Sequence, residues 1–379
     1  MERSIHSDRL FTMNVKRIVL SLGLMLTAVY GTGVVAAEKS LPRSTPEAQG
    51  VDSAGILNFV KAADNELDTI HSFILVRNGK VVGESWWAPE SAEKPHIMWS
   101  LTKSFTSTAV GFAQAEGKLS IDDKVLKYFS ETAPENPSDN LKAMRIRDLL
   151  TMSTGHEQEP RVRDSDVDWT KQFLAHPVKK KPGTFFRYNT AASYMLGAIV
   201  KKTTGEDLVD YLEPRLFKPL GIRKPKWETS PQGLSIGGYG LYVRTEDIAK
   251  FGQLYLQKGK WKGKQLLPEN WVKEATSKQV DNSDGVVYPK SDWLVGYGYQ
   301  FWQCRHGVYR GDGKDGQFCI VMPKYNTVVA MTADNQDMQS QLNLVWEHIL
   351  PALKDKPLPA NKKAQRKLKR AVAKFKAAK

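Results

Sequence analysis

The sequence has only two cysteines, Cys304 and Cys319, and it contains neither a Cys/His cluster nor an HExxH motif. These absences disfavour a structural zinc site, and no other pattern implies a metal or a cofactor. The two cysteines flank a turn-rich segment between two strand-like runs. A disulfide across a hairpin and a pair of buried, unpaired thiols both remain open.

Acidic residues are absent from residues 361–379, which carry +9 of the formal net charge of +14. Residues 1–37 carry +2, so the body of the chain, 38–360, is nearly balanced at +3. A balanced body has no general electrostatic reason to bind a polyanion, and we expect no nucleic-acid partner. For the basic Lys/Ala-rich tail, 361–379, three states stay open: weak association with anionic envelope polymers, weak binding to a membrane surface, or a solvated, disordered end.

Long apolar runs are absent except near the N-terminus, where Lys16 and Arg17 precede an uncharged stretch over 18–37 that closes with small residues. This pattern predicts a signal peptide over 1–37 and a periplasmic or secreted protein. The alternative is an uncleaved membrane anchor, because about 20 uncharged residues can just span a bilayer.

The composition, 41% hydrophobic and 10% aromatic, is that of a globular protein, and 38–360 is long enough for one large two-lobed domain. Two strand-like runs joined by Asn78-Gly79 predict a hairpin near the start of this domain. A mainly helical middle follows, and strand patterns return beyond Val295 before one last helix near 337–352. This order predicts an α+β fold in which one sheet is assembled from both chain ends around an inserted α lobe.

Three serines lie in contexts that suggest a nucleophile. Ser235 is in GLSIG, but neither an apolar strand before it nor a helix directly after it completes the nucleophile elbow, so we interpret it as part of a glycine-rich turn. Ser91 and Lys94 form an S-x-x-K pattern within a polar loop. Ser100 and Lys103 form a second S-x-x-K pattern, which opens a predicted amphipathic helix near 100–116.

The second pattern suits nucleophilic catalysis. At a helix N-terminus, backbone N–H groups and the helix dipole favour developing negative charge on Ser100. Lys103 lies three residues on and on the same helical face, within reach of the serine oxygen. A lysine can act as the base for a serine when desolvation lowers its pKa by roughly 3 units from about 10.4.

Two further segments occur in a suggestive order after this helix. Tyr188-Asn189-Thr190 precedes a helix, and Lys314-Asp315-Gly316 stands at the front of a C-terminal strand. Together with the S-x-x-K of Ser100, they resemble the S-x-x-K, Y-x-N and K-T-G elements of the serine β-lactamase and penicillin-binding-protein superfamily. The resemblance covers about 45–352. It is closest to the class C type of β-lactamase-related hydrolases, which includes esterases and 6-aminohexanoate-dimer hydrolases.

The resemblance implies a β-lactamase-like two-lobed fold, with an antiparallel sheet flanked by helices and an inserted all-α lobe. It also implies that Ser100 attacks an acyl carbon while Lys103 and Tyr188 share the proton as base and acid. The oxyanion would be held by the backbone N–H groups of Ser100 and Gln317.

The resemblance gives roles to the third motif as well. Lys314 would place positive charge beside Tyr188 and favour its phenolate. Gly316 would lie in a strand that a substrate backbone approaches closely. Four tryptophans are candidates for the walls of a cleft: Trp99, Trp169, Trp293 and Trp302.

Two positions depart from the family pattern. Thr190 stands where asparagine is common, and a hydroxyl cannot repeat the paired contacts of an amide. Asp315 stands where threonine is usual, and its carboxylate would repel an anionic substrate end unless Arg305 or Arg310 compensates. We therefore expect hydrolysis of an ester or amide bond in a small neutral substrate, ahead of β-lactamase or D-Ala-D-Ala carboxypeptidase activity.

A function from another class also fits the sequence, namely a non-catalytic penicillin-binding-like module that binds peptidoglycan. The Ser100, Lys103 and Tyr188 set disfavours it, because a binding module needs no base beside its serine. The sequence does not indicate the oligomeric state.

Overall fold

The computed structural model describes residues 40–163, 167–283 and 291–377. The predicted signal peptide therefore lies outside the described residues. Among the residues that are described, no helix is long and apolar enough to cross a membrane.

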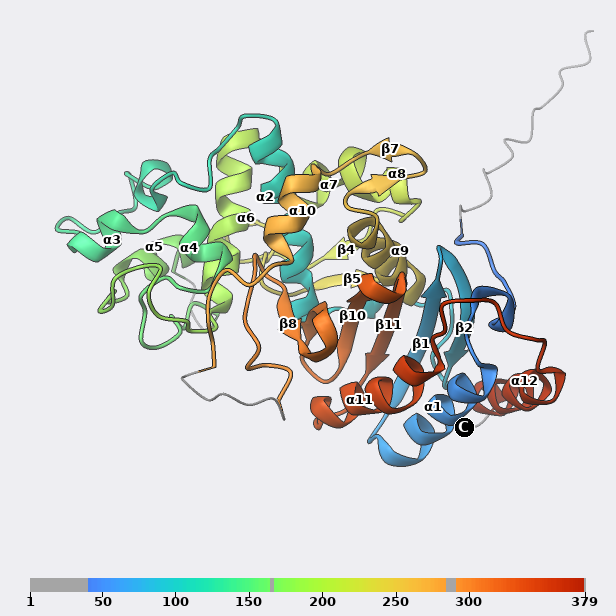
Figure 1. The fold of residues 1–379 in the computed structure, drawn as a ribbon. Helices are drawn as coiled ribbons and strands as arrows, with labels where there is room; N and C mark the ends of the chain where they lie inside the picture. The colour runs from blue at the N-terminus through green and yellow to red at the C-terminus, as the bar shows by residue number, and fades with distance from the viewer. Residues whose placement is uncertain (1–39, 164–166, 284–290, 378–379) are drawn as a thin grey trace, which may run out of the picture. The chain divides into compact units, whose positions relative to one another are not determined.

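A six-stranded antiparallel sheet in the order β2-β1-β11-β10-β9-β8 joins the two ends of the domain (Figure 1). Its strands are β1 (Ile70–Arg77), β2 (Lys80–Trp86), β8 (Trp302–Cys304), β9 (Val308–Gly313), β10 (Gln317–Met322) and β11 (Thr327–Ala333). The predicted hairpin around Asn78-Gly79 is confirmed: both residues have positive φ, 52° and 74°, as a type I′ turn requires. The first strand pairs directly with the last, Phe73 opposite Met331, which confirms the sheet built from both chain ends.

Alternating side chains of β1 divide the core into two clusters. Phe73 and Leu75 belong to the cluster formed with α1 (Ser53–Glu66) and α11 (Met338–Leu344). Ile74 and Val76 belong to the cluster on the opposite face, which includes α9 (Thr245–Leu256). This alternation of apolar residues is the period-2 pattern of a sheet buried on both faces.

The helical middle of the chain forms the predicted α lobe. Helix α2 (Thr102–Ala115) packs on α6 (Thr190–Thr204) and α7 (Leu208–Leu212) and also reaches β9, so it lies between the lobe and the sheet. The other helices are α3 (Asp139–Ala143), α4 (Ile146–Leu150), α5 (Trp169–Ala175), α8 (Lys218–Leu220) and α10 (Glu269–Ala275). Short strands form two small sheets: β3 (His96–Ile97), β4 (Lys226–Trp227), β5 (Leu241–Val243), β6 (Lys260–Trp261) and β7 (Lys264–Gln265).

Strand β9 was not predicted from the sequence. Its residues, VYRGDG, are all buried although they include an arginine, an aspartate and two glycines. Because β9 lies between β8 and β10, it also separates Cys304 from Cys319, which belong to different core clusters. Both cysteines are buried and unpaired, so of the two alternatives the structure has the pair of free thiols and not the disulfide.

The basic tail contains a helix, α12 (Lys362–Ala377), that packs on α1 and β2 (Figure 1). Phe375 is 6% exposed, its ring stacks on Trp87 with centroids 5.0 Å apart, and its carbonyl accepts a hydrogen bond from Ala88 N–H. The segment before this helix, 357–361, is also held on the domain, because Leu358 N–H bonds to the Glu47 carbonyl at 2.8 Å. The residues of α12 are therefore a docked element rather than a solvated end.

This docking predicts that Phe375→Ala lowers the free energy of unfolding by about 3 kcal/mol, the usual cost of truncating a buried phenylalanine. Chemical denaturation followed by circular dichroism measures it. Lys374→Ala, at an exposed position one residue earlier, is the matched control. Equal denaturation midpoints for the two variants would show that the helix adds nothing to stability.

Candidate active site

Ser100 lies in a short 3-10 turn, Trp99–Leu101, that runs directly into α2. The turn is fixed at both ends, because Met98 N–H bonds to the Leu241 carbonyl at 2.8 Å and Leu101 N–H bonds to the Met98 carbonyl at 3.0 Å. Trp99 has φ of 44°, a left-handed conformation that a tryptophan adopts only where its surroundings impose it. The predicted placement of Ser100 at a helix start is confirmed.

Lys103 is 1% exposed, and its Nζ donates to Ser100 Oγ at 2.8 Å and to the Gly238 carbonyl at 2.7 Å. Burial lowers the pKa of Lys103 to about 7, while Glu159 and Asp312 raise it and Arg163 lowers it. Desolvation disfavours the charged ammonium, and this is the effect that dominates. A large fraction of Lys103 is therefore neutral near pH 7.

The Gly238 carbonyl reaches Lys103 because Gly237 and Gly238 pass in close contact between α2 and α6. A Cβ on Gly238 would lie 2.5 Å from Thr190 Cγ2, and one on Gly237 would lie 2.4 Å from the Ser193 carbonyl oxygen. Only glycine fits such contacts. The consecutive glycines thus hold an acceptor against the lysine.

Tyr188 comes directly before α6, and Asn189 caps that helix by accepting a hydrogen bond from Ala192 N–H. The Tyr188 ring stacks on Trp302, with centroids 5.5 Å apart, and lies 4.9 Å from Lys103 Nζ. Burial holds the pKa of Tyr188 well above its ordinary value, while the Ser100 hydroxyl and Arg310 lower it. Tyr188 is thus a protonated phenol beside Ser100 and Lys103.

A buried ion pair lies behind these groups. Arg310 is 0% exposed and contacts the Asp312 carboxylate at 2.8 Å, and it also stacks on Trp293 at 4.2 Å. Asp312 raises the pKa of both Lys103 and Tyr188. Because Arg310 is enclosed in this pair, it is not available to compensate Asp315.

The predicted third motif lies in the turn between β9 and β10. Lys314 is largely exposed, pairs with Asp315 at 3.2 Å and stands 5.5 Å from the Trp99 ring centroid. The cation that lowers the pKa of Tyr188 is Arg310. Lys314 is therefore paired with Asp315, and it is not among the groups that shift the pKa of Tyr188. Arg305 does not compensate Asp315 either, because it is paired with Asp292 at 2.8 Å.

Gly316 and the Gln317 side chain pack on other parts of the domain, while the oxyanion role expected for the Gln317 backbone N–H stays a prediction. A Cβ on Gly316 would lie 2.0 Å from Gln341 of α11, so the close neighbour is this helix and not a substrate. The Gln317 side chain is buried and bonds to Lys314 and Ala333 carbonyls.

Gly313 is the hairpin residue that presses on the Ser100 turn. A Cβ there would lie 2.1 Å from the Met98 carbonyl oxygen and 3.1 Å from Leu101 N. Gly313 was not predicted as a site residue, because β9 itself was not predicted from the sequence. Its signal is the alternation Arg310-Gly311-Asp312-Gly313, which puts two charges on one face of a strand and two glycines on the other.

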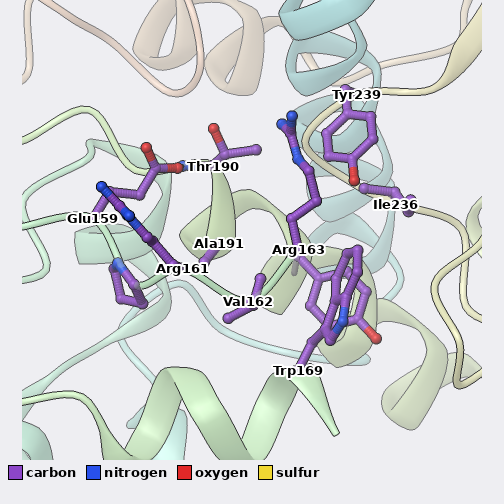
Figure 2. A pocket seen from close by; sticks show the side chains of 11 residues that line it. Glu159, Arg161, Val162, Arg163, Trp169, Thr190, Ala191, Ile236 and Tyr239 are labelled. Atoms are coloured by element: carbon purple, nitrogen blue, oxygen red, sulfur yellow. The ribbon is translucent and has the colours of Figure 1, made fainter. Parts of the chain in front are cut away.

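One cavity, of about 310 Å³, adjoins the second motif and is lined by Thr190, Glu159, Arg163 and Tyr239, among others (Figure 2). Thr190 is the first residue of α6, and its N–H donates to Glu159 Oε1 at 2.6 Å. The Arg163 guanidinium lies 4.4 Å from the Tyr239 ring centroid. Sequence reasoning missed Glu159, a carboxylate at a helix N-terminus that no motif identified.

A second cavity, of about 760 Å³, is lined by Tyr188, Trp293 and Trp302, and Glu159 belongs to both cavities. Trp169 lines the first cavity. Three of the four tryptophans expected at a cleft therefore line cavities.

The other two serines have different surroundings. Ser235 is buried and bonds to Asp207 through its N–H and its hydroxyl, as expected for a turn. Ser91 is exposed in a loop. Within the described part of the chain, no group of three or more His, Cys, Asp or Glu side chains is arranged to hold a metal ion.

The family model for β-lactamase matches residues 71–353, which is most of the described domain. The chain belongs to the β-lactamase family. It is a serine hydrolase of β-lactamase-like fold, as the resemblance implied.

Individual relatives agree with this assignment. A 6-aminohexanoate-dimer hydrolase of Paenarthrobacter ureafaciens is 23% identical over 68% of this chain and 71% of its own length. A penicillin-binding protein homologue from Caulobacter crescentus superposes with a TM-score of 0.63 and 16% identity, covering 82% of this chain and 99% of the homologue. EstCE1, a hydrolase with promiscuous acyltransferase activity, superposes with a TM-score of 0.61 and 16% identity, covering 86% and 99%.

The burial of Lys103 predicts a pH-dependent effect on stability. Between pH 7 and pH 10.5 the unfolded chain binds a proton at Lys103 that the folded chain has lost, so the wild type gains stability as the pH rises through this window. Lys103→Met does not titrate. Its stability advantage over the wild type should therefore be largest at or below pH 7, and it should shrink by about 2–3 kcal/mol between pH 6 and pH 9.

Urea denaturation of both proteins at the two pH values measures this difference. Lys118→Met, which replaces an exposed lysine, controls for the loss of one charge. A stability difference for Lys103→Met that does not vary with pH would contradict the lowered pKa.

Proposed function

We propose that this protein hydrolyses an ester or amide bond of a small substrate through an acyl-enzyme formed on Ser100. The observation that carries the proposal is the 2.8 Å hydrogen bond between Ser100 Oγ and a lysine that burial brings close to neutrality. A binding module has no use for a desolvated amine beside its serine, because burying a lysine costs stability.

Lys103 and Tyr188 act as the base and the acid in this proposal. Neutral Lys103 accepts the Ser100 proton as Oγ forms a bond to the acyl carbon. Tyr188, whose raised pKa keeps it protonated, donates its proton to the leaving oxygen or nitrogen as that bond breaks. The proton on Lys103 then restores Tyr188. In deacylation, a water molecule gives a proton to the Lys103/Tyr188 pair as its oxygen attacks the acyl carbon. The bond to Ser100 Oγ then breaks, Ser100 regains its proton and the carboxylic acid is released.

Backbone N–H groups stabilise the oxyanion in this proposal. One belongs to Ser100, at the start of α2. As the second donor we propose the backbone N–H of Lys314 in place of that of Gln317. Lys314 directly follows Gly313, the glycine that packs on the Ser100 turn. The Lys314 ammonium is directed to Asp315 and has no part in this step.

Two cavities that share Glu159 adjoin the proposed catalytic groups, since one is lined by Tyr188 and the other by Thr190, and we assign the substrate to them. The negative charge of Asp315 at the hairpin favours a neutral substrate, although Lys314 offsets part of it. A specific observation favours the alternative of a substrate with a carboxylate, as in a β-lactam or a D-Ala-D-Ala peptide: Arg161 and Arg163 line the smaller cavity.

Ser100→Ala should abolish labelling by a fluorophosphonate probe and lower kcat/KM for p-nitrophenyl acetate by at least about a thousandfold, since the nucleophile is removed. Intact mass spectrometry and a colorimetric assay measure the two effects. Ser91→Ala changes the exposed S-x-x-K serine and should leave both unchanged. A probe adduct that survives Ser100→Ala would sink the acyl-enzyme proposal.

Across a substrate panel, neutral p-nitrophenyl esters should be hydrolysed more than about tenfold faster than nitrocefin, a D-Ala-D-Ala peptide or a linear 6-aminohexanoate dimer. Asp315→Asn should raise the nitrocefin rate relative to the ester rate by about fivefold, because a carboxylate paired with an exposed lysine contributes up to about 1 kcal/mol. Steady-state kcat/KM values decide between the substrate classes. Comparable turnover of nitrocefin by the wild type would refute the assigned effect of Asp315.

A further inference from the structure

Helix α12 separates its cations from its apolar side chains. With 3.6 residues per turn, the basic residues cover about half of its circumference and the apolar residues packed on the domain cover the other side. Lys376 lies at the edge between the two, 5.3 Å from the Trp86 ring centroid. All eight basic residues of the helix are exposed: Lys362, Lys363, Arg366, Lys367, Lys369, Arg370, Lys374 and Lys376. We call this set the cationic face.

The cationic face has no internal counter-charge. Residues 361–379 contain no acid, and within the described residues none of the eight side chains forms an ion pair with a carboxylate. The helix therefore presents concentrated positive charge on a domain whose remaining body is nearly balanced. Such a face attracts an anionic surface at close range.

The apolar face of the same helix is already occupied. Phe375 stacks on Trp87, and Leu368 and Ala371 pack against the core cluster that contains α1. An amphipathic helix that inserts into a bilayer needs this face free. Any partner of α12 in the folded domain is therefore bound through charge alone.

The position of α12 relative to the start of the domain identifies which anionic surface it meets. Arg43–Pro46 and the α12 residues Leu368, Val372 and Lys376 line the two sides of one groove of about 390 Å³. The apolar run over 18–37 precedes this groove in the chain, and it directs the protein to a membrane whether it is removed as a signal peptide or kept as an anchor. The anionic surface that the folded domain meets there is that of the lipid headgroups.

We propose that the cationic face of α12 is a docking surface for an anionic phospholipid bilayer. The lysines and arginines contact headgroup phosphates without insertion, so binding is reversible and falls as salt screens the charges. Hydrolysis at Ser100 does not depend on this contact.

The test uses residues 39–379, which form one compact unit, so that the apolar N-terminal run does not contribute. Sedimentation with phosphatidylglycerol/phosphatidylcholine vesicles at low salt should show binding that disappears with pure phosphatidylcholine and weakens as salt rises. Neutralising four cations of the face should weaken binding by at least about tenfold. That variant carries Lys363→Gln, Arg366→Gln, Lys367→Gln and Arg370→Gln.

A matched variant removes the same net charge from exposed lysines on other elements, and it should bind vesicles like the wild type: Lys118→Gln, Lys171→Gln, Lys262→Gln and Lys273→Gln. Unchanged ester hydrolysis and thermal midpoint show that each variant is folded. A second α12 set keeps the test decisive if the first misfolds: Lys362→Gln, Lys369→Gln, Lys374→Gln and Lys376→Gln.

Three outcomes would overturn the proposal. The first is equal vesicle binding by the wild type and a folded α12 variant. The second is an equal loss in the matched variant, which would show a general charge effect. The third is binding to long-chain polyphosphate through α12 without binding to anionic vesicles, which would assign the face to a soluble polyanion.

Discussion

The desolvation of one amine is the constraint on which the rest of the site depends. Within the part of the chain that the structure describes, the buried Lys103 nitrogen has two hydrogen-bond partners, the Ser100 hydroxyl and the Gly238 carbonyl. In water such an amine would be charged and inert as a base, whereas here burial brings its pKa to about 7. The carboxylates of Glu159 and Asp312 act in the opposite direction and limit the fall. The balance of these effects sets the protonation of the whole cluster.

Glycines allow the close packing around Lys103 and Ser100. Gly237 and Gly238 let a loop pass between α2 and α6, and Gly313 lets β9 press on the turn that carries Ser100. On the other face of β9, Arg310 and Asp312 satisfy each other's charge within the core. The same six-residue strand thus combines close backbone approach on one face with a neutral ion pair on the other. A strand of ordinary apolar residues would allow neither.

Features specified locally in the sequence were predictable from it. Turn chemistry at Asn78-Gly79, the helix that begins after Ser100 and the i, i+3 spacing of Ser100 and Lys103 depend on neighbouring residues, and the structure confirms all three. The predicted amphipathic character of α2 is wrong, because the helix is buried on all sides from Thr102 to Ala113. The proximity of Tyr188 followed from the resemblance, not from spacing, because it arrives from a helix 85 residues further along the chain.

Features set by tertiary contacts were not predictable. The burial of β9 contradicts its composition, since only the approach of the Ser100 turn explains its glycines. Gly316 resembled a substrate-facing glycine, but Gln341 of a distant helix occupies that space. Docking of α12 depends on an aromatic partner, Trp87, that no pattern within the tail reveals.

The pairing of β1 with β11 has a consequence for how this chain folds. Phe73 and Met331 face each other across the centre of the sheet, so closing it joins segments separated by most of the domain. Such long-range contacts fold slowly, because chain entropy is lost before the contacts form. During synthesis, β1 and β2 emerge as a hairpin without a sheet, and the site that the lobe and β9 share is completed only after the last strand leaves the ribosome. The active site therefore forms only at the end of synthesis. A chain truncated before β11 lacks the central strand that holds the two ends together.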